Sequence, residues 1–461
     1  MFDVEISEIV RACGGCVCHG DTARYEHRHV TRISYDSRDC DGSTVFVPLI
    51  GERVDAHRFI NDVFAKGCIV SLSSRTDIDC SGDGIIIHVP DTLAAMQKMA
   101  SYFRERISTP VIGVTGSVGK TTTRQMIALA LSAGYRVYAT KGNNNSQIGV
   151  PNTIFNYDND AGIAVLELGM SMPGEMSEIT RIVRPDTVVF TNIGIAHIEN
   201  LGSRQKILEE KMHITDHMSE GGYVYLNHDN DLLSACRLRE GLRAYYYGMT
   251  PDCDAYPENI DMSRGFPRFT AVISGERVDV ELSVYGAHNI LNTLVALAVA
   301  RHYGVDLNAA AQAVGTFSGY AHRQQLIHAG AITIIDDTYN ASPDSMKAGI
   351  DILSGISGEG RRIAVLADMK ELGSETENAH REVGRYIRSR GNIDMLVTYG
   401  ESSEMTAEES GVENRAHFTD RGELEEYLLS ALRPGDAVFL KGSNSMGLSQ
   451  VVDRLTDSFS K

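Results

Sequence analysis

The sequence predicts an α/β protein of three domains: a small N-terminal α/β domain, a central domain with a parallel sheet of the P-loop type, and a C-terminal Rossmann-like domain. The length of 461 residues suggests about three domains of roughly 100–200 residues each. A glycine-rich turn joins an apolar strand to a helix near Gly116. From there on, strand-like and helix-like segments alternate, as in parallel sheets covered by helices. We place the domains at residues 1–106, 107–318 and 319–461.

The N-terminal domain combines short strands with helices. Residues 44–49 are strand-like and residues 57–66 have helical periodicity. Ser37 and Arg38 follow the strand-like residues 33–35, and they offer a hydroxyl and a guanidinium where a diphosphate or a uracil could bind. A surface salt bridge with Asp36 explains this tripeptide equally well.

The glycine-rich turn predicts a phosphate-binding loop. It reads Thr115-Gly116-Ser117-Val118-Gly119-Lys120-Thr121-Thr122, with Val114 where the longer P-loop pattern has a glycine. The glycines let backbone N–H groups converge on an anion, and the following helix presents its positive end. Lys120 adds a charge, and the Thr121 hydroxyl is placed to bind Mg²⁺. A plain strand-to-helix turn needs the glycines but not the lysine and threonine. We therefore expect phosphate contacts from Gly116, Ser117, Val118, Gly119, Lys120, Thr121 and Thr122.

Polar groups follow two other strands of the central domain. We expect strands at residues 111–115, 137–140, 163–168 and 187–191, and helices at 121–133 and 174–183. Glu167 ends the third strand, while Asn192 and His197 follow the fourth. Ligands of such sheets bind at the carboxyl ends of the strands. A carboxylate there is costly unless paired or liganded, so we favour a metal-linked role for Glu167 over a structural ion pair. His197 alone is ambiguous, because many histidines cap helices or pack.

Amide side chains open the last long helix of the central domain. Residues 285–292 read Y-G-A-H-N-I-L-N, and the apolar pattern continues to Tyr303. Asn289 and Asn292 would project from the first turns and could read the edge of a base. Helix capping by Asn289 is the competing interpretation.

The C-terminal domain repeats the alternation. We expect strands at residues 332–335, 363–366, 395–398 and 437–440, and helices at 343–353 and 377–390. The first strand is not followed by G-x-G-x-x-G, so dinucleotide binding is not supported. Polar turns at residues 336–343 and 441–447 follow two of the strands and predict ligand contacts.

Composition narrows the possible partners. The formal net charge is −18 and 43% of the residues are apolar, which favours a globular protein and disfavours binding to nucleic acid or anionic lipid. No apolar stretch approaches the roughly 18 residues of a membrane span, so we expect a cytoplasmic protein. Cys13 and Cys16 form a C-x-x-C without a second pair at comparable spacing, which favours reduced thiols over a zinc site.

Taken together, these motifs resemble the Mur ligases over nearly the whole chain. The general marks of that family are the phosphate loop, Glu167-Leu168-Gly169, and residues 192–197 and 286–292. Four further stretches resemble the family members that add D-alanyl-D-alanine, namely residues 51–59, 336–346, 368–373 and 441–446.

The resemblance implies a cytoplasmic, ATP-dependent amide ligase of peptidoglycan precursor synthesis, which we expect to be a monomer. Its substrates would be ATP, a UDP-N-acetylmuramoyl tripeptide and D-Ala-D-Ala, and an acyl phosphate would form on the tripeptide. The first domain would bind the UDP end and the second would bind ATP. The third would bind the dipeptide and complete the ATP site.

The same resemblance implies roles for single residues. Lys120 would contact the β- and γ-phosphates, Thr121 and Glu167 would bind one Mg²⁺, and His197 would lie near a second. Asn289 and Asn292 would lie on the adenine side, and Arg323 and Asp337 at the phosphates and ribose. The expected substrate contacts are Ser37, Arg38, Asn143, Asn145, Tyr339, Asn340 and Ser443.

Lys211 is expected to be catalytic and to bind metal as a carbamate. It lies about 12 Å along a helix that starts near Ser203. An ammonium beside two Mg²⁺ ions would have a depressed pKa, and the neutral amine can add carbon dioxide to give an anionic oxygen ligand. Relatives in the family carry such a lysine at the matching place. The alternative is a solvated lysine between acidic neighbours.

Three positions depart from the family pattern, and other interpretations stay open. Ser146 ends the G-N-x-N-N turn, His213 replaces the glutamate of K-x-E, and His322 replaces the glycine before Arg323. The alternatives are another amino-acid-adding Mur ligase, a folylpolyglutamate synthetase, or a nucleotide-regulated binding protein without ligase activity. A whole domain before the phosphate loop argues against the folate enzyme.

Overall fold

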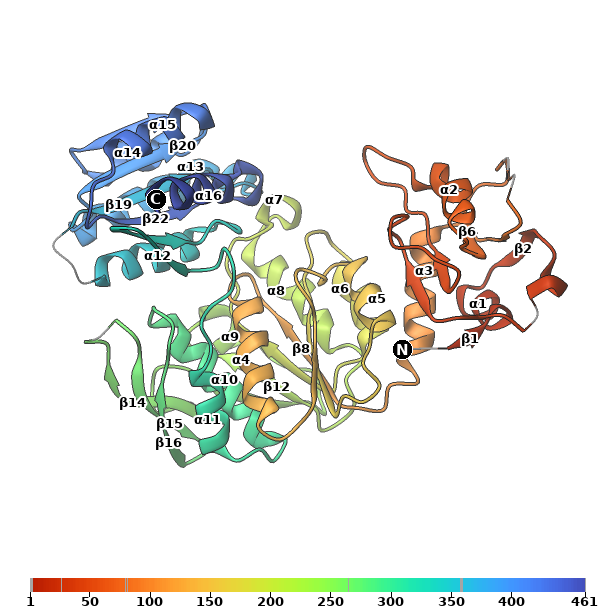
Figure 1. Cartoon of the computed structure of the whole chain (residues 1–461). Helices are drawn as coiled ribbons and strands as arrows, with labels where there is room; N and C mark the ends of the chain where they lie inside the picture. The colour runs from red at the N-terminus through yellow and green to blue at the C-terminus, as the bar shows by residue number, and fades with distance from the viewer. Residues whose placement is uncertain are drawn as a thin grey trace.

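The computed structural model describes residues 3–25, 27–78, 80, 82–263, 265–356 and 360–460. Three α/β units follow one another along the chain (Figure 1), as the predicted fold class requires. The first unit, red to orange, lies to one side, and the second and third lie against each other. Within those ranges, every helix is too short or too polar to cross a bilayer.

The N-terminal unit is built on a five-stranded sheet in the order β2-β7-β6-β5-β4. The last four of these strands are parallel and β2 pairs antiparallel at one edge. The strands are β2 (Cys16–His19), β4 (Arg32–Ser34), β5 (Thr44–Phe46), β6 (Val70–Ser73) and β7 (Ile85–His88), with a separate pair β1 (Val4–Glu5) and β3 (His29–Val30). The helices are α1 (Ile6–Cys13), α2 (Ile60–Ala65) and α3 (Thr92–Arg104). All eight cysteines of the protein are free thiols.

Helix α3 joins this unit to the central one. Its apolar residues belong to a continuous buried cluster that reaches α5 (Gly149–Phe155) and α6 (Glu175–Val183). The Phe103 ring lies edge-on to Phe155, 6.3 Å between centroids. Arg104 Nε donates to the carbonyl oxygen of Val183 at 2.7 Å. Because a buried arginine is costly unless its donors are used, this contact fixes the end of α3 on the central unit.

The central unit has a nine-stranded sheet in the order β16-β15-β14-β13-β12-β11-β8-β10-β9. Sequence alternation predicted its parallel part but not the antiparallel pairing of β14, β15 and β16 at one edge. The strands are β8 (Val111–Thr115), β9 (Val137–Ala139), β10 (Ile163–Glu167), β11 (Thr187–Phe190), β12 (Tyr223–Asn227), β13 (Arg243–Tyr247), β14 (Ala255–Asp261), β15 (Arg268–Ile273) and β16 (Glu276–Glu281).

Helices cover both faces of this sheet. One face packs against α4 (Lys120–Ser132), α10 (His288–His302) and α11 (Leu307–Gly315), and the other against α5, α6 and α8 (Arg204–Met212). Short helices α7 (Ile198–Leu201) and α9 (Asp231–Ala235) follow strand ends. The carboxyl ends of β8, β10 and β11 therefore meet at one edge, directly before α4.

The C-terminal unit is a six-stranded Rossmann-like sheet in the order β17-β18-β22-β19-β20-β21, parallel except for β17. Its strands are β17 (Gln325–Ala329), β18 (Ile332–Asp336), β19 (Arg362–Ala367), β20 (Met395–Tyr399), β21 (Arg415–Phe418) and β22 (Ala437–Lys441). Its helices are α12 (Pro343–Gly355), α13 (Thr376–Arg390), α14 (Glu404–Ser410), α15 (Arg421–Ala431) and α16 (Leu448–Phe459). Two buried clusters, one on each face, form its core.

The buried His57 and its partner Asp55 hold the loop before α2 in place. His57 Nδ1 lies 2.6 Å from Asp55 Oδ1, and His57 Nε2 accepts the backbone N–H of Ser74 at 3.0 Å. Burial raises the pKa of Asp55, but hydrogen bonds from His57 and Arg75 outweigh it and lower the pKa from 3.8 to about 2. A carboxylate with a depressed pKa stabilises the fold above its unfolded pKa, and this contribution is lost as the pH falls through its folded pKa.

We expect Asp55→Asn to lower the local unfolding free energy of β5 and β6 by about 1–2 kcal/mol at pH 7, because His57 and Arg75 lose their anionic partner. Native-state hydrogen exchange measures this quantity. The difference between variant and parent should shrink when the pH is lowered from about 4 to about 2. Asp62→Asn, at an exposed carboxylate on α2, is the control and should leave this free energy unchanged. An equal loss in both variants would contradict the assignment.

Candidate active site

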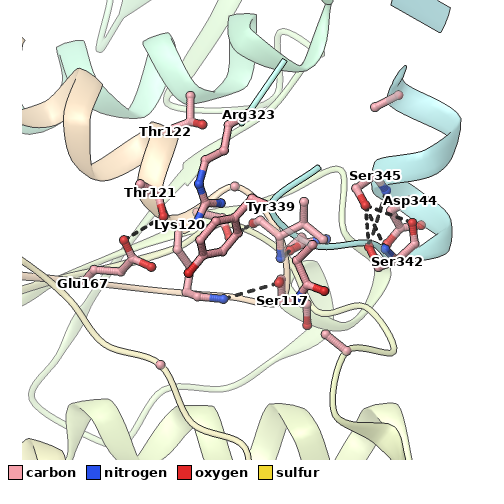
Figure 2. Close-up of a pocket in the computed structure, with 18 of the residues that line it drawn as sticks. Ser117, Lys120, Thr121, Thr122, Glu167, Arg323, Tyr339, Ser342, Asp344 and Ser345 are labelled. Carbon is pink, nitrogen blue, oxygen red and sulfur yellow. Dashed lines mark hydrogen bonds between the residues drawn. The ribbon is translucent and has the colours of Figure 1, made fainter. Parts of the chain in front are cut away.

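A cavity of about 510 Å³ lies between the central and C-terminal units. Its central-unit wall is formed by the start of α4 and the ends of strands β10 to β13, and loops around β18 and β22 form the other wall. Figure 2 shows Arg323 and Tyr339 reaching over the phosphate loop from the C-terminal unit. The cavity therefore occupies the carboxyl edge of the central sheet, where ligands of open α/β sheets bind.

The two glycines of the phosphate loop are required by its shape. A Cβ on Gly116 would lie 1.9 Å from Thr191 Oγ1, and Gly119 has a φ of 85°. Asn192 ties the loop to the end of β11, because its Oδ1 accepts the N–H of Val118 at 2.7 Å. The loop is thus held close to the next strand, with α4 beginning at Lys120.

Lys120 and Thr121 lie side by side at the start of α4. Lys120 Nζ donates to the carbonyl oxygen of Gly116 at 2.8 Å. Burial lowers the pKa of Lys120, and the charge of Glu167 opposes that shift. Thr121 Oγ1 donates to Glu167 Oε2 at 2.9 Å (Figure 2). A lysine, a hydroxyl and a carboxylate therefore converge at the position that the motif predicted.

Glu167 is buried and held by two further side chains. Asn145 Nδ2 donates to its Oε1 at 2.7 Å, so Asn145 contacts the predicted metal ligand. Arg124 Nε lies 3.9 Å from its Oε2, and this nitrogen is buried without a hydrogen-bond partner in the described chain. Sequence reasoning missed Arg124, because an arginine one turn into a helix normally points to solvent.

His197 connects the two units. Its Nδ1 lies 2.6 Å from Glu371 Oε2, an ion-pair distance, although this buried nitrogen has no aligned hydrogen-bond partner among the described residues. The contact with His197 lowers the pKa of Glu371. His197 has a φ of 64° and Glu371 also has a φ of 64°, so both ends of the contact have strained backbone.

Arg323 enters the cavity from a strained turn. Its guanidinium carbon lies 3.8 Å from the centroid of the Tyr339 ring. The neighbours His322 and Gln324 have φ values of 61° and 54°. His322 thus keeps the left-handed conformation that the family's glycine adopts freely, and its Nδ1 lies 2.7 Å from Asp336 Oδ2, a contact that glycine cannot make.

Asp337 is paired with Lys441, a residue to which the sequence assigned no partner. Lys441 Nζ lies 2.6 Å from Asp337 Oδ2 and donates to the carbonyl oxygen of Asn340 at 2.8 Å. Burial lowers the pKa of Lys441. Tyr339 and Asn340 both line the cavity, whereas Ser443 is buried outside the lining, where its Oγ accepts the N–H of Lys370 at 2.9 Å.

The two helix amides differ in position. Asn292 lines the cavity and accepts a hydrogen bond from Thr123 Oγ1 at 2.9 Å. Asn289 lies behind it, where its Oδ1 accepts from Asn292 Nδ2 at 3.0 Å and its Nδ2 donates to the carbonyl oxygen of Tyr285 at 2.8 Å. Asn289 is inside α10 rather than at its N-cap, so the capping interpretation is wrong.

Besides Ser443, three expected substrate contacts lie outside this cavity. Ser37 and Arg38 are in the N-terminal unit, where Arg38 pairs with Asp36 as the salt-bridge interpretation predicted. Asn143 is exposed in the turn before α5. The structure brings none of them to the phosphate loop.

Lys211 lies on α8 and is 1% exposed, so the alternative of a solvated lysine is wrong. Burial is the larger cause that lowers the pKa of Lys211 well below its usual value, and the charge of Lys120 lowers it further. The expected repulsion by two Mg²⁺ ions is a separate effect and stays a prediction. Glu210 lies next to Lys211 in sequence, and its Oε1 accepts the backbone N–H of Met176 at 3.0 Å.

Asp344 is a cavity residue to which the sequence assigned no role. It follows Ser342, whose side chain caps α12, and it lines the cavity opposite Ser117 (Figure 2). A Cβ on Gly194 would lie 2.9 Å from Asp344 Oδ2. Burial raises the pKa of Asp344. No hydrogen bond from the described chain reaches its carboxylate, which leaves an acceptor free in the cavity.

Comparison with known proteins identifies the family. Residues 114–300 match the Mur ligase middle domain, and residues 322–444 match the domain described as Mur ligase, glutamate ligase domain. The chain belongs to the Mur ligase family. A Bacillus subtilis protein named UDP-N-acetylmuramoyl-tripeptide--D-alanyl-D-alanine ligase is 34% identical over 443 residues, 94% of this chain and 95% of that protein.

Solved Mur ligase structures share the fold. A crystal structure of MurF from Acinetobacter baumannii superposes with a TM-score of 0.89 at 28% identity, over 99% of both chains. MurF ligase from Thermotoga maritima in complex with ADP superposes with a TM-score of 0.82 at 26% identity, over 93% of this chain and 98% of that chain. The three-domain arrangement is thus that of the Mur ligases.

The pairing of Lys441 with Asp337 allows a test of the C-terminal wall. We expect Lys441→Met to lower the local unfolding free energy of β18 and β22 by about 3–5 kcal/mol, because Asp337 would be left buried without its cation. Hydrogen exchange in these two strands measures the loss. Adding Asp337→Asn to the variant should restore most of the lost protection. Equal protection in Lys441→Met and the parent would refute this account.

Proposed function

We propose that this protein is an ATP-dependent ligase that joins D-alanyl-D-alanine to UDP-N-acetylmuramoyl tripeptide in peptidoglycan precursor synthesis. The observation that carries this function is one cavity that combines a phosphate loop and a buried carboxylate with Arg323 and Asp337 of another domain. Eight relatives at 28–34% identity, each aligned over at least 92% of this chain, carry the name of that ligase.

The reaction proceeds in two steps. The γ-phosphoryl group of ATP passes to the terminal carboxylate of the tripeptide, which gives an acyl phosphate and ADP. The amine of the dipeptide then attacks the acyl carbon, and the tetrahedral intermediate expels phosphate to leave an amide. Positioning and charge neutralisation dominate such transfers. Lys120 and Arg323 neutralise the phosphates from opposite walls, and Asn292 lies toward the base, with Asn289 holding it.

The residues beside Lys120 fit Mg²⁺. Thr121 and Glu167 supply adjoining hydroxyl and carboxylate oxygens, which are the donors that Mg²⁺ prefers. His197 lines the same cavity, where its Nδ1 contacts Glu371, and we assign the ring to a second ion. Bound there, Mg²⁺ would neutralise charge on the phosphates. Asn145 keeps Glu167 oriented, and Arg124 supports its charge from the protein side.

Asp344 suits the amine of the incoming dipeptide. Its carboxylate is a free acceptor in the cavity, on the C-terminal wall that we assign to the dipeptide together with Tyr339, Asn340 and, behind them, Ser443. An ammonium placed against it would be held by a charge-assisted hydrogen bond. The carboxylate could then accept the proton that the amine must lose before attack.

We propose that each domain binds a different substrate or part of a substrate. We assign residues 1–106 to the UDP end, with Ser37 and Arg38 as contacts. Residues 107–318 take ATP and the tripeptide's reacting end, where Asn143 and Asn145 approach it. Residues 319–461 take the dipeptide and complete the ATP site. We also propose a cytoplasmic monomer, consistent with a described chain whose helices are unsuited to a bilayer.

Lys211 is proposed to act as a carbamate ligand. It is almost fully buried, and the charge of Lys120 adds to burial in favouring its neutral form. A neutral amine adds carbon dioxide with loss of one proton, which would turn an unfavourable cation into an oxygen donor for the metals. His213, in place of the family's glutamate, pairs with Asp216 at 2.8 Å and so takes no part.

The product tests the function directly. Phosphate release should require both the tripeptide and D-Ala-D-Ala, and the product mass should equal the tripeptide plus the dipeptide minus one water. Release with a single amino acid in place of the dipeptide would favour another adding enzyme. Nucleotide binding without turnover would favour a regulatory protein.

Lys120→Ala should lower turnover about a hundredfold, because one cationic contact to the transferring phosphoryl group is lost. Turnover is measured as phosphate release with both substrates present. Lys206→Ala, at an exposed lysine on α8, is the control and should keep parental activity. Retention of more than about a tenth of the turnover by Lys120→Ala would reject its role.

Asp344→Asn should raise KM for D-Ala-D-Ala about tenfold or more, because a charged hydrogen bond is lost, while KM for ATP stays unchanged. In the parent, kcat/KM for the dipeptide should fall as the pH is lowered, because protonation removes the carboxylate. Since the pKa of Asp344 is raised, this fall should begin nearer to neutral pH than for an ordinary aspartate. The fall should be absent in the variant. Glu377→Gln, at an exposed carboxylate paired with Arg381, is the control. An unchanged KM for the dipeptide would remove Asp344 from the site.

Removing bicarbonate and carbon dioxide from the buffer should lower the activity of the parent. Lys211→Ala should be inactive and partly restored by short carboxylic acids, which supply the missing oxygen donors. Mass spectrometry under gentle conditions would detect the carbamate. Indifference to bicarbonate together with near-normal activity of Lys211→Ala would exclude the carbamate.

A further inference from the structure

Three metal-ligand side chains converge just beyond the ends of β12 and β13. Ligand atoms of His228, Asp252 and Cys253 all lie within 4.8 Å of one another, and no other such group of three occurs in the described part of the chain. His228 directly follows β12, and the other two lie in the turn between β13 and β14. The trio is separate from the residues that line the nucleotide cavity.

The backbone around the trio is fixed by hydrogen bonds between the two loops. The N–H of His228 donates to the carbonyl oxygen of Tyr247 at 2.8 Å, and the N–H of Cys253 donates to that of Thr250 at 3.2 Å. The N–H of Met249 donates to Asp229 Oδ1 at 3.1 Å. The backbone that carries the three side chains is therefore fixed by the fold.

The three side chains differ in solvent exposure, as expected of a metal site that an ion can reach from solvent. Cys253 is 6% exposed, His228 is half-buried and Asp252 is exposed. A Cβ on Gly248 would lie 2.8 Å from Cys253 Sγ and 2.9 Å from Asp229 Oδ1. Gly248 thus leaves room beside the sulfur, and a second carboxylate adjoins the same space.

We propose that His228, Asp252 and Cys253 bind a zinc-like divalent ion, at a site distinct from the Mg²⁺ of the phosphate loop. A thiolate, an imidazole and a carboxylate are the donors that Zn²⁺ takes, with ligand bonds of about 2.0–2.3 Å. Mg²⁺ prefers oxygen donors and disfavours sulfur. Three protein ligands leave one tetrahedral position for water.

The alternative is an ordinary polar turn. Asp252 Oδ1 accepts a hydrogen bond from Thr250 Oγ1, and a buried cysteine often serves as a small apolar residue. These contacts account for Asp252 and Cys253 singly. Packing edge-on to Tyr246, 5.6 Å between centroids, likewise accounts for the His228 ring singly. None of these contacts accounts for the convergence of all three ligand atoms within 4.8 Å of one another.

The site would act on the nucleotide cavity through two strands. Asn227, the last residue of β12, and Tyr247, the last residue of β13, both line the cavity. An ion that joins His228 to Cys253 would cross-link the loops that follow these strands. Metal binding should therefore stabilise this edge of the sheet, whatever reaction the protein catalyses.

Cobalt titration of the full chain tests the site. The chelator-treated protein should bind one Co²⁺ that produces a thiolate-to-cobalt charge-transfer band, and Zn²⁺ should abolish the band whereas excess Mg²⁺ should not. Cys253→Ser should remove the band. His228→Gln should weaken Co²⁺ binding at least about tenfold, since even an outer-shell partner can matter that much. Circular dichroism would show that each variant is folded.

A matched cysteine distinguishes this site from any other thiol. Cys236 is half-buried and lies outside the trio, so Cys236→Ser should leave the band and the Co²⁺ affinity unchanged. The second variant, His228→Gln, keeps the test decisive if Cys253→Ser fails to fold. A parent without the band, or a band retained in His228→Gln at parental affinity, would overturn the proposal. A band that is lost only in a Cys16→Ser, Cys18→Ser variant would assign the metal to β2 and would overturn it equally.

Discussion

Charge held out of water is the constraint on which this site depends. Arg124, Glu167 and Lys211 are almost fully buried around the start of α4, and Lys120 adds a further cation whose charge reaches Lys211. One carboxylate, Glu167, faces the cations Arg124 and Lys120, while burial and the charge of Lys120 favour the neutral form of Lys211. This excess of positive charge costs free energy in a poorly hydrated place unless an anion completes it. A triphosphate is such an anion. A protein with a net charge of −18 can therefore bind a polyanionic substrate through a local cluster.

The same constraint explains how the C-terminal unit contributes. The two neighbours of Arg323, His322 and Gln324, have a left-handed backbone conformation. This strain is compensated by the contact of His322 with Asp336 and by that of Gln324 with His288. The second contact between the units is the His197–Glu371 pair. The first contact fixes Gln324 beside Arg323 in the cavity, and the second joins Glu371 to His197 at the cavity wall. Bringing the two units together in this way excludes water that would hydrolyse an acyl phosphate. Domain contact and chemistry thus depend on the same few side chains.

The sequence by itself determined the elements and the phosphate loop. Strands β8, β10 and β11 and helix α4 lie within a residue or two of their predicted bounds, because the apolar pattern and the glycines act over a few neighbouring residues. Glu167 could be assigned to the site because a charged residue at the end of an apolar strand has few other places to go. The resemblance to Mur ligases supplied the contacts from the other domain.

Only the tertiary structure decided which side chains meet. It placed Asn289 behind Asn292, gave Asp337 the partner Lys441, buried Lys211, and brought Arg124 to Glu167. It also left the Asp344 carboxylate free in the cavity and brought His228 to Cys253 from another loop. Apart from the contact of Asn289 with Asn292, these facts depend on residues far apart in the chain, so no local pattern encodes them. Burial and through-space charge arise only when the sheets stack and the domains close on one another.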